Sequence, residues 1–232
     1  DCDGLCLNDS DGDGVCDESE IAGCTAPTAC NFNSLATDED GACDFCSCAN
    51  DEILSFGLEI DTVAVHDTGA LAGMVTYRLF VTTILETDFV SAVYGNVEDT
   101  LLLSAETGWH QDAMGSHLAQ AINPGLYSSF PELAYDSWVT IGIDQPASEG
   151  ENQVNAVGES GAEGWVAQFE SGNDLVMDDE IGGSWFILNG GSNGIAGDDL
   201  RVLIAQVTTL GSMQGQLNVQ VFNDGDNGAS SL

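Results

Sequence analysis

The eight cysteines of this 232-residue chain all lie within its first 48 residues. A segment so short and polar cannot bury a large core, so cross-links must supply much of its stability. Zinc sites usually show paired CxxC units or histidines, and this segment has one CxxC pair and no histidine. We therefore predict disulfides, whose pairing stays open because eight cysteines allow 105 connectivities. The predicted disulfide cysteines are Cys2, Cys6, Cys16, Cys24, Cys30, Cys43, Cys46 and Cys48.

A calcium-loop pattern overlaps the first cysteines. Residues 9–20, DSDGDGVCDESE, match the twelve-residue pattern D-x-D-x-D-G-x5-E. Alternating aspartates offer hard oxygen ligands, Gly14 permits the sharp turn, and a glutamate in the twelfth place can bind through both oxygens. A merely solvated acidic turn would not need that glutamate. We predict that Ca²⁺ is held by Asp9, Asp11, Asp13, the carbonyl of Val15, Asp17 and Glu20.

Two resemblances follow from these motifs. The calcium loop resembles the thrombospondin type 3 repeat or half of a dockerin loop. Residues 23–43, GCTAPTACNFNSLATDEDGAC, are similar to a cysteine-rich module repeated in large secreted proteins of marine bacteria, particularly Bacteroidota. Together the two motifs cover about a seventh of the chain. The resemblance implies a secreted or surface-anchored multidomain protein, in which the module itself has no known catalysis.

Four polar residues of the second motif allow two interpretations. Asn31, Asn33, Asp38 and Asp40 form either a second calcium site or Asx turns held by disulfides. The sequence does not decide between them.

The composition changes near residue 52, and from there the sequence favours strands. Leu217, Val219 and Val221 alternate with polar residues, as in a half-buried strand. Further strands are expected at 54–65, 75–83, 89–94, 138–143, 165–169, 185–188 and 202–209, and only residues 113–122 suggest a helix. With no βαβ rhythm, the fold predicted is mainly β: an antiparallel, jelly-roll-like β-sandwich behind the disulfide-rich module. The expected domains are 1–52 (disulfide-rich and calcium-binding), 53–223 (β-sandwich) and 224–232 (flexible tail).

Charge excludes several functions. The chain has 39 acids, two arginines and no lysine, for a net charge of −37. Nucleic-acid binding, a phosphate-binding GK[ST] loop and lysine Schiff-base chemistry all need cations that are missing. No apolar run is long enough to span a bilayer. Because the start, Asp1-Cys2-Asp3, shows no basic, apolar leader, we expect a mature product or an excised piece that works outside the cell or on its surface.

The two arginines and one acidic run carry separate expectations. Arg78, on a predicted strand, is expected to anchor a carboxylate within the sandwich. Arg201 is expected to pair with the acids at 198–199, just before it. Residues 178–180 are read as a solvated turn, with a third calcium site as the alternative.

No catalytic pattern stands out, and we expect no enzyme. His66 and His110 have acidic neighbours, but no Gly-x-Ser-x-Gly elbow is present, and the spacing of His110 and His117 does not suit a helical metal pair. The favoured hypothesis is a calcium-stabilised structural or adhesive subunit that self-associates through strand edges or tails, as in a fibre or surface layer, or binds other surface proteins. The alternatives are a secreted hydrolase with an unrecognised site and a carbohydrate-binding or adhesin module. In a carbohydrate-binding module, the four tryptophans would form the sugar-binding face; the other interpretation is that they are core residues. They are Trp109, Trp138, Trp165 and Trp185.

Overall fold

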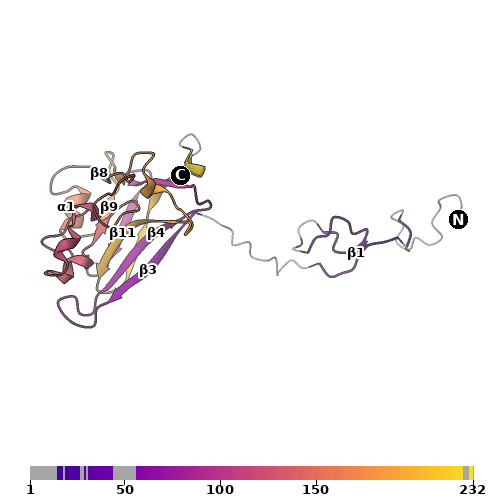
Figure 1. The fold of residues 1–232 in the computed structure, drawn as a ribbon, viewed down its shortest axis with the longest axis horizontal. Coiled ribbons are helices and arrows are strands. Elements are labelled where there is room, and N and C mark those ends of the chain that lie inside the picture. The colour runs from indigo at the N-terminus through magenta and orange to yellow at the C-terminus, as the bar shows by residue number, and fades with distance from the viewer. Residues whose placement is uncertain are drawn as a thin grey trace. The chain divides into compact units, whose positions relative to one another are not determined.

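The chain divides into two compact units, residues 1–54 and 55–232, hereafter the N-terminal and C-terminal units (Figure 1). The structure is a computed structural model that describes residues 15–17, 19–26, 29, 31–43, 56–226 and 230–231. In the N-terminal unit, two short strands pair in parallel, β1 (Ala22–Gly23) and β2 (Asp38–Glu39).

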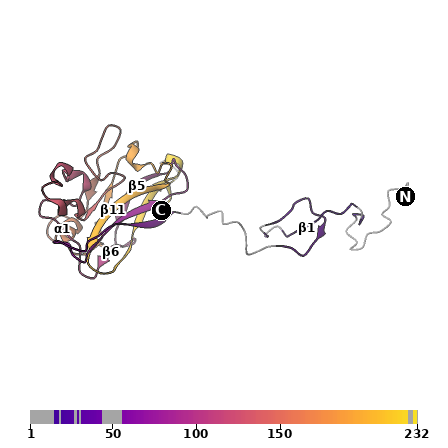
Figure 2. The same cartoon turned by 60° about the horizontal axis from the view of Figure 1, so that its bottom comes forward.

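The C-terminal unit is built from antiparallel sheets, which can be followed in Figures 1 and 2. The first sheet has the order β3 (Gly57–Val65), β4 (Val75–Thr82), β11 (Arg201–Thr209), β7 (Trp138–Val139). The second has the order β14 (Ser230–Ser231), β13 (Asn218–Phe222), β5 (Phe89–Gly95), β10 (Gly183–Phe186), β8 (Asn155–Val157). The third has the order β12 (Met213–Gln216), β6 (Leu101–Ala105), β9 (Leu175–Met177).

The third sheet prolongs the second, because its strands adjoin β13, β5 and β10 in sequence and keep the same order. Gly95 is the last residue of β5, and a loop of five residues joins it to the start of β6 at Leu101. A Cβ atom at Gly95 would lie 2.6 Å from the Cβ of Leu101 and 2.8 Å from that of Met177. Only glycine therefore fits at position 95 without a shift of the neighbouring strands β6 and β9.

Alternation along the strands places a single core between the first and second sheets. Leu79 and Val81 of β4, Ile204 of β11, Val93 of β5 and Trp185 of β10 are buried in the same cluster. Such two-sheet packing removes apolar surface from both inner faces at once. The prediction of a mainly β chain with an antiparallel sandwich is confirmed.

Two of the predicted strands differ from the structure. Residues 165–169 form part of a helix, α1 (Trp165–Glu170), because Trp165 and Phe169 lie four residues apart and are both buried. The strand expected at 138–143 ends at Val139, and Gly142 has a φ of 72°. A Cβ at Gly142 would lie 1.7 Å from the carbonyl oxygen of Asn193, so this turn requires glycine.

Short 3-10 helices cover part of the outer face of the first sheet. Within the expected helix at 113–122, only η1 (Ala119–Ala121) is helical, and η2 (Pro124–Leu126) and η3 (Pro131–Tyr135) follow it. Their side chains pack on Trp138 and Leu203 as a second apolar cluster. No helix among the described residues has the length and apolar character that crossing a bilayer requires.

Two further 3-10 helices lie in the C-terminal unit, η4 (Ser192–Gly194) and η5 (Asn223–Gly225). The backbone amide of Asp224 in η5 donates to Oδ1 of Asp88, 2.9 Å away, and Thr87 donates its hydroxyl to Oδ1 of Asp224. The start of the expected tail is therefore hydrogen-bonded to the residues that precede β5.

Candidate functional site

A disulfide joins Cys24 and Cys43 in the N-terminal unit, with the two Cα atoms 4.9 Å apart. Cys16 is also disulfide-bonded. Three of the eight predicted disulfide cysteines are thus bridged in the structure. The other five lie outside the described residues: Cys2, Cys6, Cys30, Cys46 and Cys48.

The predicted calcium loop falls largely outside the described residues. Asp9, Asp11 and Asp13 are not described, whereas Val15, Asp17 and Glu20 are. The ligand set at residues 9–20 therefore stays a prediction from the sequence.

At the second candidate calcium site, three of the four residues hydrogen-bond to backbone groups. Oδ1 of Asn33 accepts from the amide of Leu35 at 3.1 Å, the arrangement of an Asx turn. Oδ1 of Asp40 accepts from the amide of Ala42 at 2.8 Å, and Nδ2 of Asn31 donates to the carbonyl of Ala42 at 2.7 Å. The fourth residue, Asp38, lies in β2. These bonds fit the turn interpretation, and calcium at this site stays a prediction.

Glu39 is a tether of the same unit that sequence reasoning missed. Its Oε2 accepts from both the amide and the hydroxyl of Thr25, each at 2.9 Å. These two hydrogen bonds lower the pKa of Glu39 because they favour its charged form. Glu39 also lies close to the sulfurs of Cys24 and Cys43, but sulfurs joined in a disulfide are not thiolate ligands for a metal.

In the C-terminal unit, β3 is an unusually long edge strand. It has nine residues and pairs on one side only, with β4 (Figure 1). Every other sheet edge in the described part of this unit is a strand of two to four residues. Proteins commonly protect an edge by shortening it or by placing proline or lysine in it, and β3 contains neither.

Apolar side chains along β3 are open to solvent. Leu58 and Ile60 pair with Val81 and Leu79 of β4, which are buried, so all four belong to the core face of the sheet. Yet those of β3 are about half exposed, as are two valines near its end. The exposed fractions are 51% for Leu58, 46% for Ile60, 44% for Val63 and 63% for Val65.

A groove of about 280 Å³ runs beside this edge, between β3 and β13. We call it the seam, because it is the open side of the sandwich where the two sheets meet. Its lining is apolar: Phe56, Gly57, Leu58, Val81, Leu217, Val219 and Val221. A further strand beside β3 would cover the seam and complete the core.

Arg201 neutralises the acids on the outer face of β3. Its Nη1 lies 3.0 Å from Oδ2 of Asp61 and 3.3 Å from Oε1 of Glu59, and its guanidinium stacks 4.2 Å from the ring centre of Phe80. The expected local pairing with residues 198–199 is wrong. The cause is strand order, since β4 lies between β3 and β11 and offers the aromatic ring on which Arg201 extends toward β3.

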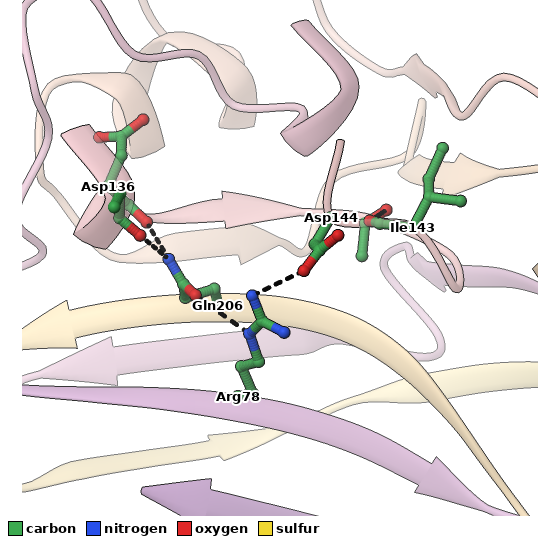
Figure 3. Close-up of polar contacts among 7 residues, drawn as sticks. Arg78, Asp136, Ile143, Asp144 and Gln206 are labelled. Atoms are coloured by element: carbon green, nitrogen blue, oxygen red, sulfur yellow. Dashed lines mark hydrogen bonds and ion pairs between the residues drawn. The ribbon is translucent and has the colours of Figure 1, made fainter. Parts of the chain in front are cut away.

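Arg78 belongs to a polar network on the outer face of the first sheet (Figure 3). Its Nη2 lies 2.9 Å from Oδ2 of Asp144, and its Nε donates to Oε1 of Gln206 at 3.1 Å. Nε2 of Gln206 in turn donates to the carbonyls of Ala134 and Asp136, at 3.1 and 3.0 Å. Arg78 therefore anchors a carboxylate, as expected, but on the outer face of the sheet rather than inside the sandwich.

Next to this network, the carboxylate of Asp136 is fully buried. It accepts from the backbone amides of Asp112 at 2.7 Å and Ser116 at 3.0 Å, and so shapes the turn between them. Burial raises the pKa of Asp136 to about 7, against these hydrogen bonds, which lower it. A Cβ at Gly115 would lie 1.9 Å from Oδ2 of Asp136, so glycine is required there.

The histidines that sequence analysis considered for catalysis hold hydrogen bonds or are buried. Nε2 of His66 lies 2.8 Å from the hydroxyl of Thr76, and Nδ1 of His117 lies 2.7 Å from Oε1 of Glu170. Burial lowers the pKa of His110 and so favours its neutral form. No nucleophile is hydrogen-bonded to a histidine and an acid together among the described residues.

The tryptophans and the acidic turn have structural positions. Trp109, Trp138, Trp165 and Trp185 are all buried, so the hypothesis that they form a sugar-binding face is wrong and the core interpretation is confirmed. Oδ1 of Asp179 accepts from the amides of Ile181 and Gly182, each at 2.7 Å, as in a hydrogen-bonded turn.

Comparison with known proteins adds no relative: no family model, no curated protein and no solved structure matches the chain.

Proposed function

We propose that this chain is an extracellular structural or adhesive protein, stabilised by calcium and disulfides, that self-associates through the edge of β3. The observation that carries the proposal is a nine-residue edge strand with four half-exposed apolar side chains beside the open seam. The Cys24–Cys43 disulfide supports an oxidising compartment.

The partner proposed for β3 is the β3 strand of a second copy. Strand addition needs free backbone groups on one edge and apolar side chains that alternate toward the core. A second β3 meets both needs, since it offers Leu58 and Ile60 at alternate positions. Two identical strands pair antiparallel about a two-fold axis, which closes a dimer. A fibre or surface layer needs a second contact elsewhere.

The local charges at β3 permit this pairing. Two copies that each carry a net charge of −37 repel one another. At β3, however, the only two acids are Glu59 and Asp61, and Arg201 pairs with both. Divalent calcium in the medium would further screen the remaining repulsion.

The test is sedimentation velocity of the full chain in calcium-containing buffer over a range of concentrations. We expect Ile60→Lys to raise the dissociation constant of self-association by about a hundredfold or more, because a symmetric contact carries the substitution twice. The matched control is Ile181→Lys, which adds the same charge at an exposed isoleucine (72%) in a turn away from β3.

Association that survives Ile60→Lys unchanged, or is weakened equally by Ile181→Lys, would rule out β3 as the contact. A wild-type chain that stays monomeric up to about millimolar concentration would rule out self-association itself.

Calcium binding at residues 9–20 is the second part of the proposal, and it predicts a stability effect. Extracellular modules of this kind bind calcium with dissociation constants of roughly 10⁻⁴–10⁻³ M. With calcium at ten to a hundred times that constant, chelation removes ~1.4–2.7 kcal/mol from the free energy of unfolding of the N-terminal unit. Calorimetry should show its melting temperature falling with EGTA, and Asp13→Ala should produce the same fall without chelator.

The control for this substitution is Asp51→Ala, an acid outside both motifs, which should leave the calcium effect intact. Identical melting temperatures in calcium and in EGTA would rule out calcium binding at residues 9–20, but would not affect the proposal for β3.

A further inference from the structure

A groove of about 540 Å³ crosses the outer face of the second sheet, on the side away from the core. Its volume lies within the roughly 300–1,000 Å³ typical of small-ligand sites. The lining combines aromatic and aliphatic side chains with small and polar ones, of which only Asp99 is charged: Ser91, Ala92, Tyr94, Asp99, Ser184, Phe186, Ile187, Leu188, Asn189, Gln220 and Phe222.

Strand register places these side chains on one face. Tyr94 pairs with Ser184, and Ala92 pairs with Phe186 on one side and Gln220 on the other. The residues between them in sequence, such as Val93 and Trp185, are fully buried toward the core. Since Ala92 carries only a methyl group, β5 forms the floor of the groove, and the larger side chains of β10 and β13 form its two sides.

Hydrogen bonds hold one wall of the groove. Nδ2 of Asn218 donates to the carbonyls of Tyr94, Asp99 and Thr100, at 3.3, 2.8 and 3.2 Å. This fixes the turn that carries Asp99. Burial and the nearby charge of Asp99 raise the pKa of Tyr94, so its hydroxyl stays protonated and can donate.

The opposite wall and the aromatic end are fixed as well. Nδ2 of Asn152 donates to the carbonyl of Leu188 at 2.7 Å, and the amide of Ile187 donates to the carbonyl of Ser91 at 2.9 Å. The ring of Phe222 stacks on that of Phe89, with centroids 5.9 Å apart. The groove is therefore built before any ligand binds, which lowers the entropy lost on binding.

Three polar side chains in this groove are available to hydrogen-bond a ligand. Within the described residues, the hydroxyls of Tyr94 and Ser184 and the amide of Asn189 make no side-chain hydrogen bond to protein. A ligand that fits must have apolar faces for the rings and several hydroxyls for these groups. A sugar ring has both, with C–H bonds on its faces and hydroxyls on its rim. We propose that this groove binds a neutral oligosaccharide.

Other ligand classes fit the groove less well. A peptide strand would need a free backbone edge, but β5 is paired on both sides, with β13 and β10, and offers only side chains. A polyanion would meet Asp99, the only charged residue of the lining, on a chain with a net charge of −37. Neutral sugars avoid this repulsion.

The experiment is isothermal titration calorimetry of the full chain against a panel of neutral hexasaccharides: cello-, manno-, xylo- and laminari-oligosaccharides. A polygalacturonate oligomer of equal length is the anionic comparison. We expect at least one neutral hexasaccharide to bind with a dissociation constant below about 1 mM, and the anionic oligomer to bind at least about tenfold more weakly.

Two substitutions locate the site. Tyr94→Ala and Phe186→Ala should each weaken binding by about tenfold or more, while Phe186→Tyr keeps a ring and should retain it. Phe130→Ala is the matched control, because Phe130 is also a half-exposed aromatic (46%) but lies outside the groove. Unchanged melting temperatures establish that the variants fold.

Three outcomes would overturn the proposal: no binding by any neutral sugar at millimolar concentration, binding unaffected by both alanine variants, or equal binding of the anionic oligomer. Because the groove and β3 belong to different sheets, Ile60→Lys should leave sugar binding intact. A lack of sugar binding would therefore not count against self-association through β3, and a lack of self-association would not count against sugar binding in the groove.

Discussion

Replacing Asp136 with alanine is expected to lower the free energy of unfolding of the C-terminal unit by about 2–4 kcal/mol at pH 5. The variant leaves the amides of Asp112 and Ser116 without the carboxyl that accepts their hydrogen bonds. A fully buried donor left unsatisfied costs about 1–3 kcal/mol, and because these two amides are only partly buried, their combined cost lies in the lower half of twice that range. Chemical denaturation monitored by tryptophan fluorescence measures this loss, because all four tryptophans lie in the same unit.

The loss should be smaller at pH 8 than at pH 5. The pKa of Asp136 is about 7 in the folded chain and 3.8 without burial, so the folded state holds the proton more tightly. The stabilisation from this group is therefore complete below pH ~4 and declines as the pH rises to about 7, by up to ~4 kcal/mol in total. Above pH 7 the wild type itself carries a buried charge, which narrows its advantage over alanine.

Asp136→Asn isolates the titration: its Oδ1 can accept one of the two amide hydrogen bonds, its Nδ2 cannot accept the other, and that loss does not depend on pH. Asparagine keeps the shape and loses the proton equilibrium, so the difference in unfolding free energy between wild type and variant should change between pH 4 and 7 and be flat outside that window. Comparing the two chains cancels the titration of the other acids, which they share. A difference that stays constant from pH 4 to 8 would contradict the raised pKa.

Removing the Cys24–Cys43 disulfide by the double change Cys24→Ser and Cys43→Ser is the second large effect expected. The bond closes a loop with a sequence separation of 19 residues. In the chain-entropy model, opening a loop of that size costs about 3 kcal/mol of stability. For so small a unit that loss is expected to abolish most of its folding at 37 °C.

Calorimetry should show the transition of the N-terminal unit lost or strongly lowered and that of the C-terminal unit unchanged, because the latter has no cysteine. Glu39→Gln is an informative companion. It keeps the disulfide and weakens the hydrogen bonds to Thr25, so its effect should be much smaller. An N-terminal transition that survives the double substitution intact would show that the remaining cross-links suffice.

Local sequence patterns predicted the parts of this fold that depend on local alternation. Leu79 and Val81, or Val219 and Val221, point to the core because strand geometry repeats every two residues. The same rule failed at Trp165, where five apolar and polar residues fit a helix as well as a strand.

The candidate sites depended on strand order, which local patterns do not contain. That β3 is an edge, and that Arg201 reaches Asp61 across 140 residues of sequence, both follow from the pairing of β4 with β3 and β11. The groove is similar: Tyr94 and Phe186 share an outer face only through the register of β5 and β10. Sequence patterns suggested the tryptophans as the sugar-binding residues instead, but these large side chains gain the most free energy from burial and lie in the core.

Hydrogen exchange at residues 57–65 shows whether two copies meet at the edge of β3. Spectra of the wild-type chain in calcium would be compared at a concentration well below and well above its dissociation constant. Pairing through β3 should slow exchange of the β3 amides at the higher concentration and leave those of β8, one edge of the second sheet, unchanged. Slowing confined to β8, or no slowing in β3 although the chain associates, would contradict it.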